Sequence, residues 1–135
     1  MSFHSFKNAE WDKDSICQFK VEINDTLTPH YISVVIRHND NYSYRNLWLF
    51  IDISSPFGTV RCDTLDCELA DNLGNWLGQG ISVYQFEKPY EKYIRFPRSG
   101  VYTFSICQGM RDDMLKNISE VGIKLDMEKT VKITP

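Results

Sequence analysis

The sequence lacks any apolar run long enough to cross a membrane. Its longest clean apolar stretch lies around Leu47 to Ile51, whereas a spanning helix needs about 20 predominantly apolar residues. It also lacks a basic stripe, since acidic and basic residues are mixed along the chain and the formal net charge is −3 at pH 7. Proteins that bind nucleic acid cluster Lys and Arg against the phosphates, so no nucleic-acid partner is expected.

The start of the chain lacks the features of a signal peptide. It opens Met1-Ser2-Phe3-His4, with neither a charged first region nor an apolar segment behind it. Taken alone, this start indicates a cytosolic protein, and removal of an export signal upstream is the open alternative.

Signatures of catalysis are missing as well. There is no Gly-x-Ser-x-Gly segment, and no cysteine has a nearby histidine in a recognisable pattern. His30 follows Pro29 and His38 begins a His-Asn-Asp turn, so both are interpreted as loop residues. The glycine-rich segment 74–80 precedes a predicted strand, whereas phosphate-binding loops lead into a helix. The sequence therefore predicts neither an enzyme nor a cofactor.

Metal ligands are few and dispersed. The three histidines lie far apart and supply no zinc spacing. Asp63, Asp66, Glu68 and Asp71 offer oxygen atoms to calcium but lack the Asp-x-Asp-x-Asp-Gly loop of a specific site. They are interpreted as a solvated sheet edge that discourages pairing with other strands.

Apolar and polar residues alternate along much of the sequence with a period of two. Cys17, Phe19, Val21 and Ile23 alternate with polar residues, as expected for a half-buried strand. Residues 45–53 are apolar on both faces, which predicts a central strand covered on both sides. Further strands are expected at 31–37, 59–62, 66–70, 81–86, 91–96, 101–107 and 120–127. The pattern predicts an all-β fold: an antiparallel, jelly-roll-like β-sandwich of about eight or more strands, with one short helical turn at 112–117.

The length of 135 residues is typical of one domain. We expect a flexible N-terminal segment over 1–10, a single β-sandwich domain over 11–128 and a C-terminal tail over 129–135.

The four cysteines are Cys17, Cys62, Cys67 and Cys107. Cys62 and Cys67 flank a tetrapeptide, and if this is a hairpin loop the two thiols face each other within bridging distance. The favoured pattern is therefore one disulfide, Cys62 to Cys67, with Cys17 and Cys107 free inside strands. Four reduced thiols are the alternative if the tetrapeptide is not a loop.

Aromatic residues exceed what one small core needs, and aromatic platforms on sandwiches stack on sugar rings or anchor partner proteins. Trp76 is expected to be mostly buried, with Gly74, Gly78 or Gly80 at positive φ in the same loop. Arg111 is expected to bond carbonyl groups or a carboxylate and so to fix a corner of the fold. The candidate interaction or structural residues are Tyr42, Tyr44, Trp48, Trp76 and Arg111.

Several ordered segments resemble one family. They are Tyr42-Ser43-Tyr44-Arg45-Asn46-Leu47-Trp48-Leu49, Asp63-Thr64, Leu69-Ala70-Asp71-Asn72-Leu73-Gly74-Asn75-Trp76-Leu77-Gly78-Gln79-Gly80, Phe96, Gly100-Val101-Tyr102, Met110-Arg111, Leu115 and Ile118-Ser119-Glu120-Val121-Gly122-Ile123. Together they resemble the GldH-type gliding-motility lipoproteins of the Bacteroidetes, and the match runs from about Trp11 to Glu128.

The resemblance implies a lipoprotein held in the cell envelope, facing the periplasm, by an acylated N-terminal cysteine. Cys17 is not that cysteine, because it lies inside an amphipathic strand, so the lipidated end would lie upstream of Phe3. The implied partners are the membrane, through the lipid, and proteins of the envelope or the gliding machinery. The family brings no catalytic residues.

The resulting hypothesis is a non-catalytic envelope lipoprotein with an assembly or scaffolding role through protein contacts. The alternative is a glycan-binding β-sandwich module that uses surface aromatics. A row of exposed Trp and Tyr along a concave sheet favours the glycan, whereas a convex apolar patch favours a protein partner.

Overall fold

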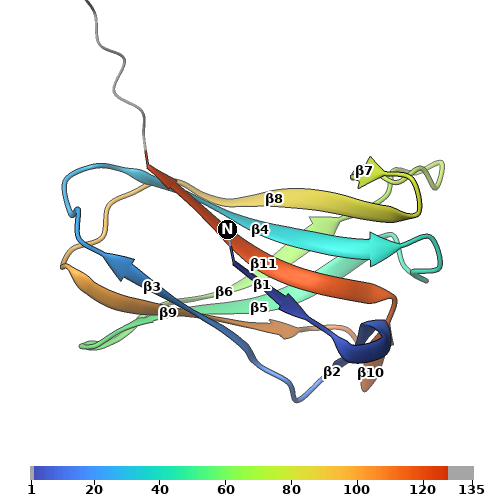
Figure 1. Ribbon diagram of the computed structural model, residues 1–135, viewed down its shortest axis with the longest axis horizontal. Coiled ribbons are helices and arrows are strands. Elements are labelled where there is room, and N and C mark those ends of the chain that lie inside the picture. The colour runs from blue at the N-terminus through green and yellow to red at the C-terminus, as the bar shows by residue number, and fades with distance from the viewer. Residues whose placement is uncertain (1, 128–135) are drawn as a thin grey trace, which may run out of the picture.

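A computed structural model describes residues 2–127, in which two antiparallel sheets pack face to face (Figure 1). The five-stranded sheet has the order β1 (Ser2–Ser5), β11 (Ile118–Met127), β4 (His30–Asn39), β8 (Val83–Ile94) and β7 (Gln79–Gly80). The four-stranded sheet has the order β3 (Cys17–Ile23), β9 (Gly100–Gln108), β5 (Asn46–Ser55) and β6 (Gly58–Glu68). A short pair, β2 (Glu10–Asp12) and β10 (Met114–Lys116), lies at one end. No helix within 2–127 is long and apolar enough to span a membrane.

The core forms where the alternating strands turn their apolar sides toward each other. Tyr102, Phe104 and Ile106 of β9 are at most 1% exposed, while the residues between them face outward. Strand β4 is buried on both faces, because Val35 on its outer side is as inaccessible as Val34 and Ile36 on its inner side. The predicted all-β antiparallel sandwich is confirmed.

The helical turn is misplaced in the prediction. Segment 112–117 contains β10, whereas the 3₁₀ turn of the described chain is η1 (Lys7–Ala9). The predicted flexible segment over 1–10 is also wrong for residues 2–10, because β1 pairs with β11 over its whole length and Trp11 behind it is fully buried. The predicted tail over 129–135 lies outside the described residues.

The predicted Cys62–Cys67 disulfide is wrong. Both residues lie in β6, an uninterrupted strand that extends through the tetrapeptide, and five residues of extended chain span roughly 17 Å. Their side chains point to opposite faces, Cys62 exposed and Cys67 buried. All four thiols are free, as in the alternative left open above.

Candidate interaction surface

Ion-paired side chains cover the middle of the outer face of the five-stranded sheet. Two of its ion pairs cross between strands, with N–O distances of 3.2 Å for Arg37–Glu120 and 3.5 Å for Lys124–Glu87. A third, Lys124–Asp126 at 3.8 Å, lies within β11. The Arg37 guanidinium also lies 3.9 Å from the centre of the Phe3 ring. The apolar side chain on this side of β4, Val35, is fully buried.

The outer face of the four-stranded sheet is different, because large apolar side chains stand in solvent. Trp48 and Phe50 project from β5 with 40% and 52% of their surface exposed, and Ile16, just before β3, is 56% exposed. The prediction that residues 45–53 are covered on both faces is therefore wrong. Strand β5 is central in its sheet, but within 2–127 only the turn at Gly109 and Met110 contacts its outer side, and Trp48 and Phe50 stay about half exposed.

Two hollows adjoin these side chains. The larger, of about 490 Å³, has contributions from all four strands and is lined by Ile16, Phe50, Asp52, Cys62, Ser105 and Cys107, among others. The smaller, of about 280 Å³, is lined by Tyr44, Asn46, Trp48, Gly109, Met110, Arg111 and Asp112. Small residues form the gaps: a Cβ atom at Gly109 would lie 3.1 Å from the Phe50 ring. We call Ile16, Trp48 and Phe50 with these two hollows the apolar face.

The apolar face carries uncompensated negative charge. The charged side chains that alternation directs outward from this sheet are Lys20, Glu22, Asp52, Asp66 and Glu68. Arg111 and Asp112 line the smaller hollow, so two positive and five negative groups give the face a net charge of −3, and none of them forms an ion pair with another described residue. Asp66 lies directly across from Trp48, and Asp52 follows Phe50 on the same side of β5.

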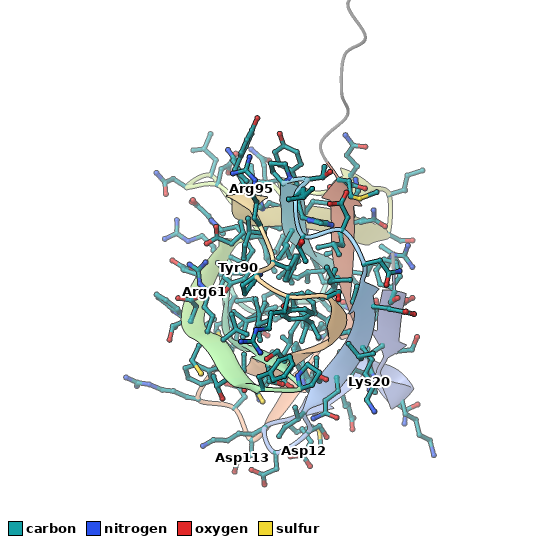
Figure 2. The ribbon with its side chains drawn as sticks, turned by 90° about the vertical axis from the view of Figure 1, so that its left-hand side faces the viewer. Asp12, Lys20, Arg61, Tyr90, Arg95 and Asp113 are labelled. Atoms are coloured by element: carbon teal, nitrogen blue, oxygen red, sulfur yellow. The ribbon has the colours of Figure 1, made fainter. Side chains whose placement is uncertain are left out.

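The apolar face is convex. Figure 2 looks along the strands and shows β6, marked by Arg61, and β3, marked by Lys20, at opposite edges of the four-stranded sheet. Both edges curve toward the five-stranded sheet, so the inner side wraps the core and the outer side bulges into solvent.

The predicted aromatic residues divide between the surface and the interior. Tyr44 and Trp48 both line the smaller hollow, and the Tyr44 hydroxyl donates a hydrogen bond to Asp112 at 2.7 Å. Tyr42 is buried and its hydroxyl donates to the Asn46 carbonyl at 2.8 Å. Phe50 was missed, because an alternating strand looks the same in sequence whether or not its outer face is covered.

Arg111 does not fix a corner of the fold. It is exposed, lines the smaller hollow, and forms no hydrogen bond or ion pair with the rest of the described chain. The predicted structural role is therefore wrong. The turn at this corner is held instead by the buried Gln108 side chain, which donates to the Asp112 carbonyl and accepts from the Met110 amide, both at 2.8 Å.

Trp76 belongs to an aromatic cluster around a buried histidine. Its ring is half-buried, with its centre 4.5 Å from that of His38, and Tyr84 stacks on the same imidazole. The loop that carries Trp76 turns through Gly74 and Gly80, whose φ angles of +84° and +152° confirm the predicted positive φ.

His38 is fully buried near the end of β4, and His30 is buried at its start, so the interpretation of both as loop residues is wrong. The His38 Nδ1 lies 3.1 Å from the Asn39 carbonyl, whereas Nε2 has no hydrogen-bond partner in the described structure. Burial lowers the pKa of His38 below its ordinary value of 6.5, because the charged imidazolium would lose its hydration there.

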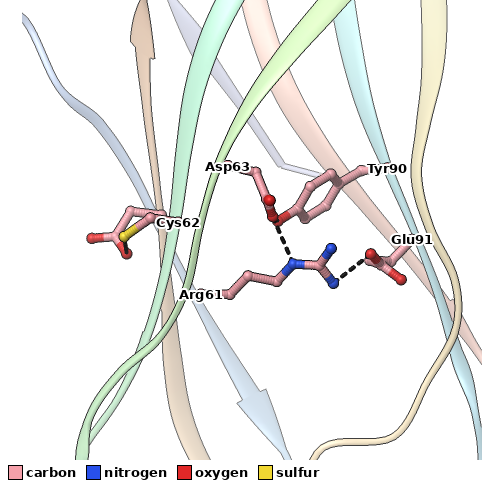
Figure 3. A network of polar contacts seen from close by, with 6 residues as sticks. Arg61, Cys62, Asp63, Tyr90 and Glu91 are labelled. Atoms are coloured by element: carbon pink, nitrogen blue, oxygen red, sulfur yellow. Dashed lines mark hydrogen bonds and ion pairs between the residues drawn. The ribbon is translucent and has the colours of Figure 1, made fainter.

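A polar network closes the side of the sandwich where β6 approaches β8 (Figure 3). Tyr90 donates to Asp63, Arg61 Nε donates to the same carboxylate at 2.6 Å, and the Arg61 guanidinium pairs with Glu91. The hydrogen bond from Tyr90 is the largest cause that lowers the pKa of Asp63. Asp63 thus serves to join the sheets, and no set of three or more His, Cys, Asp or Glu side chains within 2–127 could hold a metal ion.

The thiols differ in their surroundings. Cys62 is exposed and its Sγ donates to Asp52 at 3.2 Å, and this hydrogen bond is the main cause that raises the thiol pKa. Burial raises the pKa of Cys17 and of Cys67 to about 12. The exposed and buried thiols are therefore all held in the protonated, weakly nucleophilic form.

Comparison with known proteins gives one consistent result. The family model described as GldH lipoprotein matches residues 1–125. The "Gliding motility lipoprotein GldH homolog" of Christiangramia forsetii is 34% identical, over 87% of this chain and 77% of the relative. The "Gliding motility lipoprotein GldH" of Flavobacterium johnsoniae is 29% identical, over 93% of this chain and 84% of the relative.

Proposed function

Because this chain belongs to the GldH lipoprotein family, we propose that it is a lipid-anchored envelope protein with a non-catalytic assembly or scaffolding role. Its relatives are named gliding motility lipoproteins, and we propose that this chain serves envelope or gliding machinery in the same way. Its native form carries an N-terminal lipid and faces the periplasm.

The observation that carries the scaffolding role is the contrast between the two outer faces. One is covered in its middle by its own ion pairs over a buried Val35, whereas the other exposes Trp48 and Phe50 beside two hollows. Contiguous exposed apolar surface of this kind marks protein interaction sites. The face as a whole bulges outward, so a flat or concave protein surface can cover it, and side chains of that protein can enter the two hollows. The shape therefore favours a protein partner over the glycan alternative.

The described side chains also support a role without catalysis. The exposed thiol, Cys62, lies beside a carboxylate that raises its pKa, which disfavours the nucleophilic thiolate. His38 is buried in the aromatic cluster, where its Nδ1 lies beside the Asn39 carbonyl and its Nε2 has no hydrogen-bond partner among the described residues. A nucleophile needs a base within hydrogen-bond reach.

The scaffolding role is tested by affinity capture of the full-length lipidated protein from its native envelope. The variant Trp48→Ser/Phe50→Ser is expected to lose its co-purifying proteins and to keep its melting temperature within a few degrees, because both side chains are half in solvent. The matched control is Ile81→Ser, which removes a 91% exposed apolar side chain outside the apolar face and is expected to retain the partners. Full capture by the folded double variant would contradict the proposal, and retention on purified cell-wall glycan alone would favour the glycan-binding alternative.

The lipid anchor is tested separately by detergent phase partition and intact mass of the native protein. Partition into the detergent phase, with a mass that exceeds the polypeptide by its acyl groups, is the expected outcome. An unmodified protein in the aqueous phase would contradict the anchor and leave the apolar face to be judged by the capture experiment.

A further inference from the structure

We infer that the partner docks on the apolar face with a positively charged protein segment, in which Lys or Arg side chains flank an apolar anchor residue. The inference rests on the proposed function, since it assumes that a protein covers this face, and it names the chemistry of that protein.

The charge of the apolar face favours a cationic partner. The charged side chains of this face are five carboxylates, one amine and the Arg111 guanidinium, and none of them forms an ion pair within residues 2–127. Within the same residues, Asp52 and Asp66 accept hydrogen bonds only from the neutral groups of Cys62 and Asn46. The opposite outer face of the sandwich has its charges joined by ion pairs. A partner that covers Trp48 and Phe50 removes water from Asp66 and Asp52 beside them, and a desolvated carboxylate without a counter-charge is costly. A cationic partner supplies that counter-charge, whereas a neutral or acidic one does not.

The positions of the carboxylates also favour a partner segment with cationic groups. Asp66 lies across from Trp48, and Asp52 lies two residues beyond Phe50 on the same side of β5. The two carboxylates therefore bracket the aromatic pair, four residues apart along the strand direction, or roughly 13 Å at about 3.3 Å per residue. The hollow of about 490 Å³ is lined by Phe50 and Asp52 but not by Asp66. A partner side chain that enters this hollow lies beside Asp52, and a cationic group farther along the same segment reaches Asp66 across from Trp48.

The same charge argues against direct docking of this face on a lipid surface. A leaflet that contains anionic lipids has a negative surface potential, which attracts clusters of Lys and Arg. A convex face with a net charge of −3 is repelled by such a surface, although its exposed Trp and Phe alone would suit the membrane interface. The charge therefore selects a basic protein rather than an anionic bilayer.

The test is site-specific photo-crosslinking of the full-length lipidated protein in its native envelope. A benzoylphenylalanine residue replaces Phe50 on the apolar face or, as the control position, Tyr31 on the outer face of the five-stranded sheet. The expected result is a protein adduct from position 50, whose crosslinked peptide contains Lys or Arg near the attachment point. The adduct yield is expected to fall as NaCl rises, because salt screens exposed ion pairs.

Charge variants test whether Asp52 and Asp66 contribute to binding of the partner. With the crosslinker at position 50, Asp52→Asn and Asp66→Asn are each expected to reduce the adduct yield at low salt by about two- to five-fold, the range of exposed ion pairs. Asp126→Asn is the matched control, since Asp126 is an exposed aspartate on the other outer face. It is expected to leave the yield unchanged.

The outcomes separate the two proposals. An acidic or uncharged crosslinked peptide, a lipid or sugar adduct alone, or a yield insensitive to both aspartate variants would overturn the inference. A protein adduct from position 31 but not from position 50 would overturn it too, while a scaffolding role through the other face would stand. No protein adduct from either position would overturn the inference and the scaffolding role together.

Discussion

Tyr90 on β8 donates a hydrogen bond to Asp63 on β6 and so joins the two sheets at their open side. Within residues 2–127, β6 pairs through its main chain only with β5, so side chains alone close the gap to β8. Arg61 reinforces the closure by pairing with Asp63 on its own strand and with Glu91 on β8.

This connection makes stability depend on pH in a defined direction. The folded-state pKa of Asp63 lies below its ordinary value of 3.8, chiefly because of Tyr90. Its stabilising contribution is therefore present above pH 3.8 and is lost as the pH falls through the lower, folded-state pKa. Tyr90→Phe is expected to lower the free energy of unfolding by about 1 kcal/mol at pH 7, less than a fully buried charged hydrogen bond because these groups are partly solvated.

The measurement is urea unfolding of wild type and Tyr90→Phe between pH 2.5 and 7. The difference between them is expected to shrink below pH 4. Tyr31→Phe is the control, since its hydroxyl lies on the outer face away from this network. A difference that stays constant down to pH 2.5 would show that Tyr90 acts through packing and not through Asp63.

The thiols give a second prediction. In the unfolded, unreduced protein, a thiol titration is expected to count four free thiols, because no two cysteines are paired.

In the folded state of a Cys107→Ser variant, alkylation at pH 8 is expected at Cys62, while buried Cys17 and Cys67 stay protected. Adding Asp52→Asn is expected to raise the rate at Cys62, because loss of the hydrogen bond to the carboxylate lowers the thiol pKa toward its ordinary value. An unchanged rate would place the cause of the raised pKa elsewhere.

The alternation of side chains predicted the fold class, because the same period of two governs every long strand. It could not predict which outer faces are covered. Val35 and Phe50 are both outward-facing apolar residues on internal strands, yet Val35 is fully buried and Phe50 is half exposed. The difference comes from the order of strands in the sheets and from long-range pairs such as Arg37 with Phe3, which local sequence does not encode.

The error at Cys62 and Cys67 has a similar cause. Strands are expected at 59–62 and 66–70, and the predicted disulfide depends on a hairpin loop in the tetrapeptide between the two cysteines. The chain instead continues as β6, where the carboxylate of Asp63 is satisfied by Tyr90, 27 residues further on. A polar residue with a distant partner looks like a solvated turn residue until the fold supplies that partner.

The N-terminal strand gives a third prediction. A Cβ atom at Gly122 would lie 2.6 Å from the Ser2 carbonyl oxygen and 2.7 Å from the Phe3 ring, and both contacts belong to β1. Gly122→Val is therefore expected to displace β1 and leave the pairing of β11 with β4 intact, at a cost of roughly 1–3 kcal/mol.

Hydrogen exchange checks this prediction. Amides of residues 2–5 are expected to lose protection in Gly122→Val, while those of β4 keep theirs. Gly74→Ala is the control, because its Cβ would meet no atom within 4 Å and its only cost is the positive φ. Global loss of protection in Gly122→Val would mean that β1 is integral to the stability of the whole sandwich.

The aromatic cluster gives the last prediction, which concerns Trp76 and His38. Trp76 is half-buried, so Trp76→Ala is expected to cost about 2–3 kcal/mol at pH 7.5, below the roughly 3–5 kcal/mol of a fully buried aromatic. Loss of the indole ring, whose centre lies 4.5 Å from that of His38, admits water to the imidazole. The His38 pKa, lowered by burial in the wild type, is then expected to rise toward 6.5.

The sign of the pH dependence follows from that shift. A histidine whose folded pKa lies below its unfolded value loses stability as the pH falls below about 6.5, because the unfolded chain binds the proton more readily. The fall to pH 5 therefore destabilises the wild type more than it destabilises Trp76→Ala, and the difference in free energy of unfolding between them is expected to shrink from pH 7.5 to pH 5.

NMR titration of the His38 ring and urea unfolding at both pH values measure the two effects. Trp48→Ala, which removes an exposed indole from the apolar face, is expected to change neither. If His38 titrates identically in wild type and Trp76→Ala, burial beneath the indole is not what lowers its pKa, and the neighbouring Tyr84 becomes the residue to remove next.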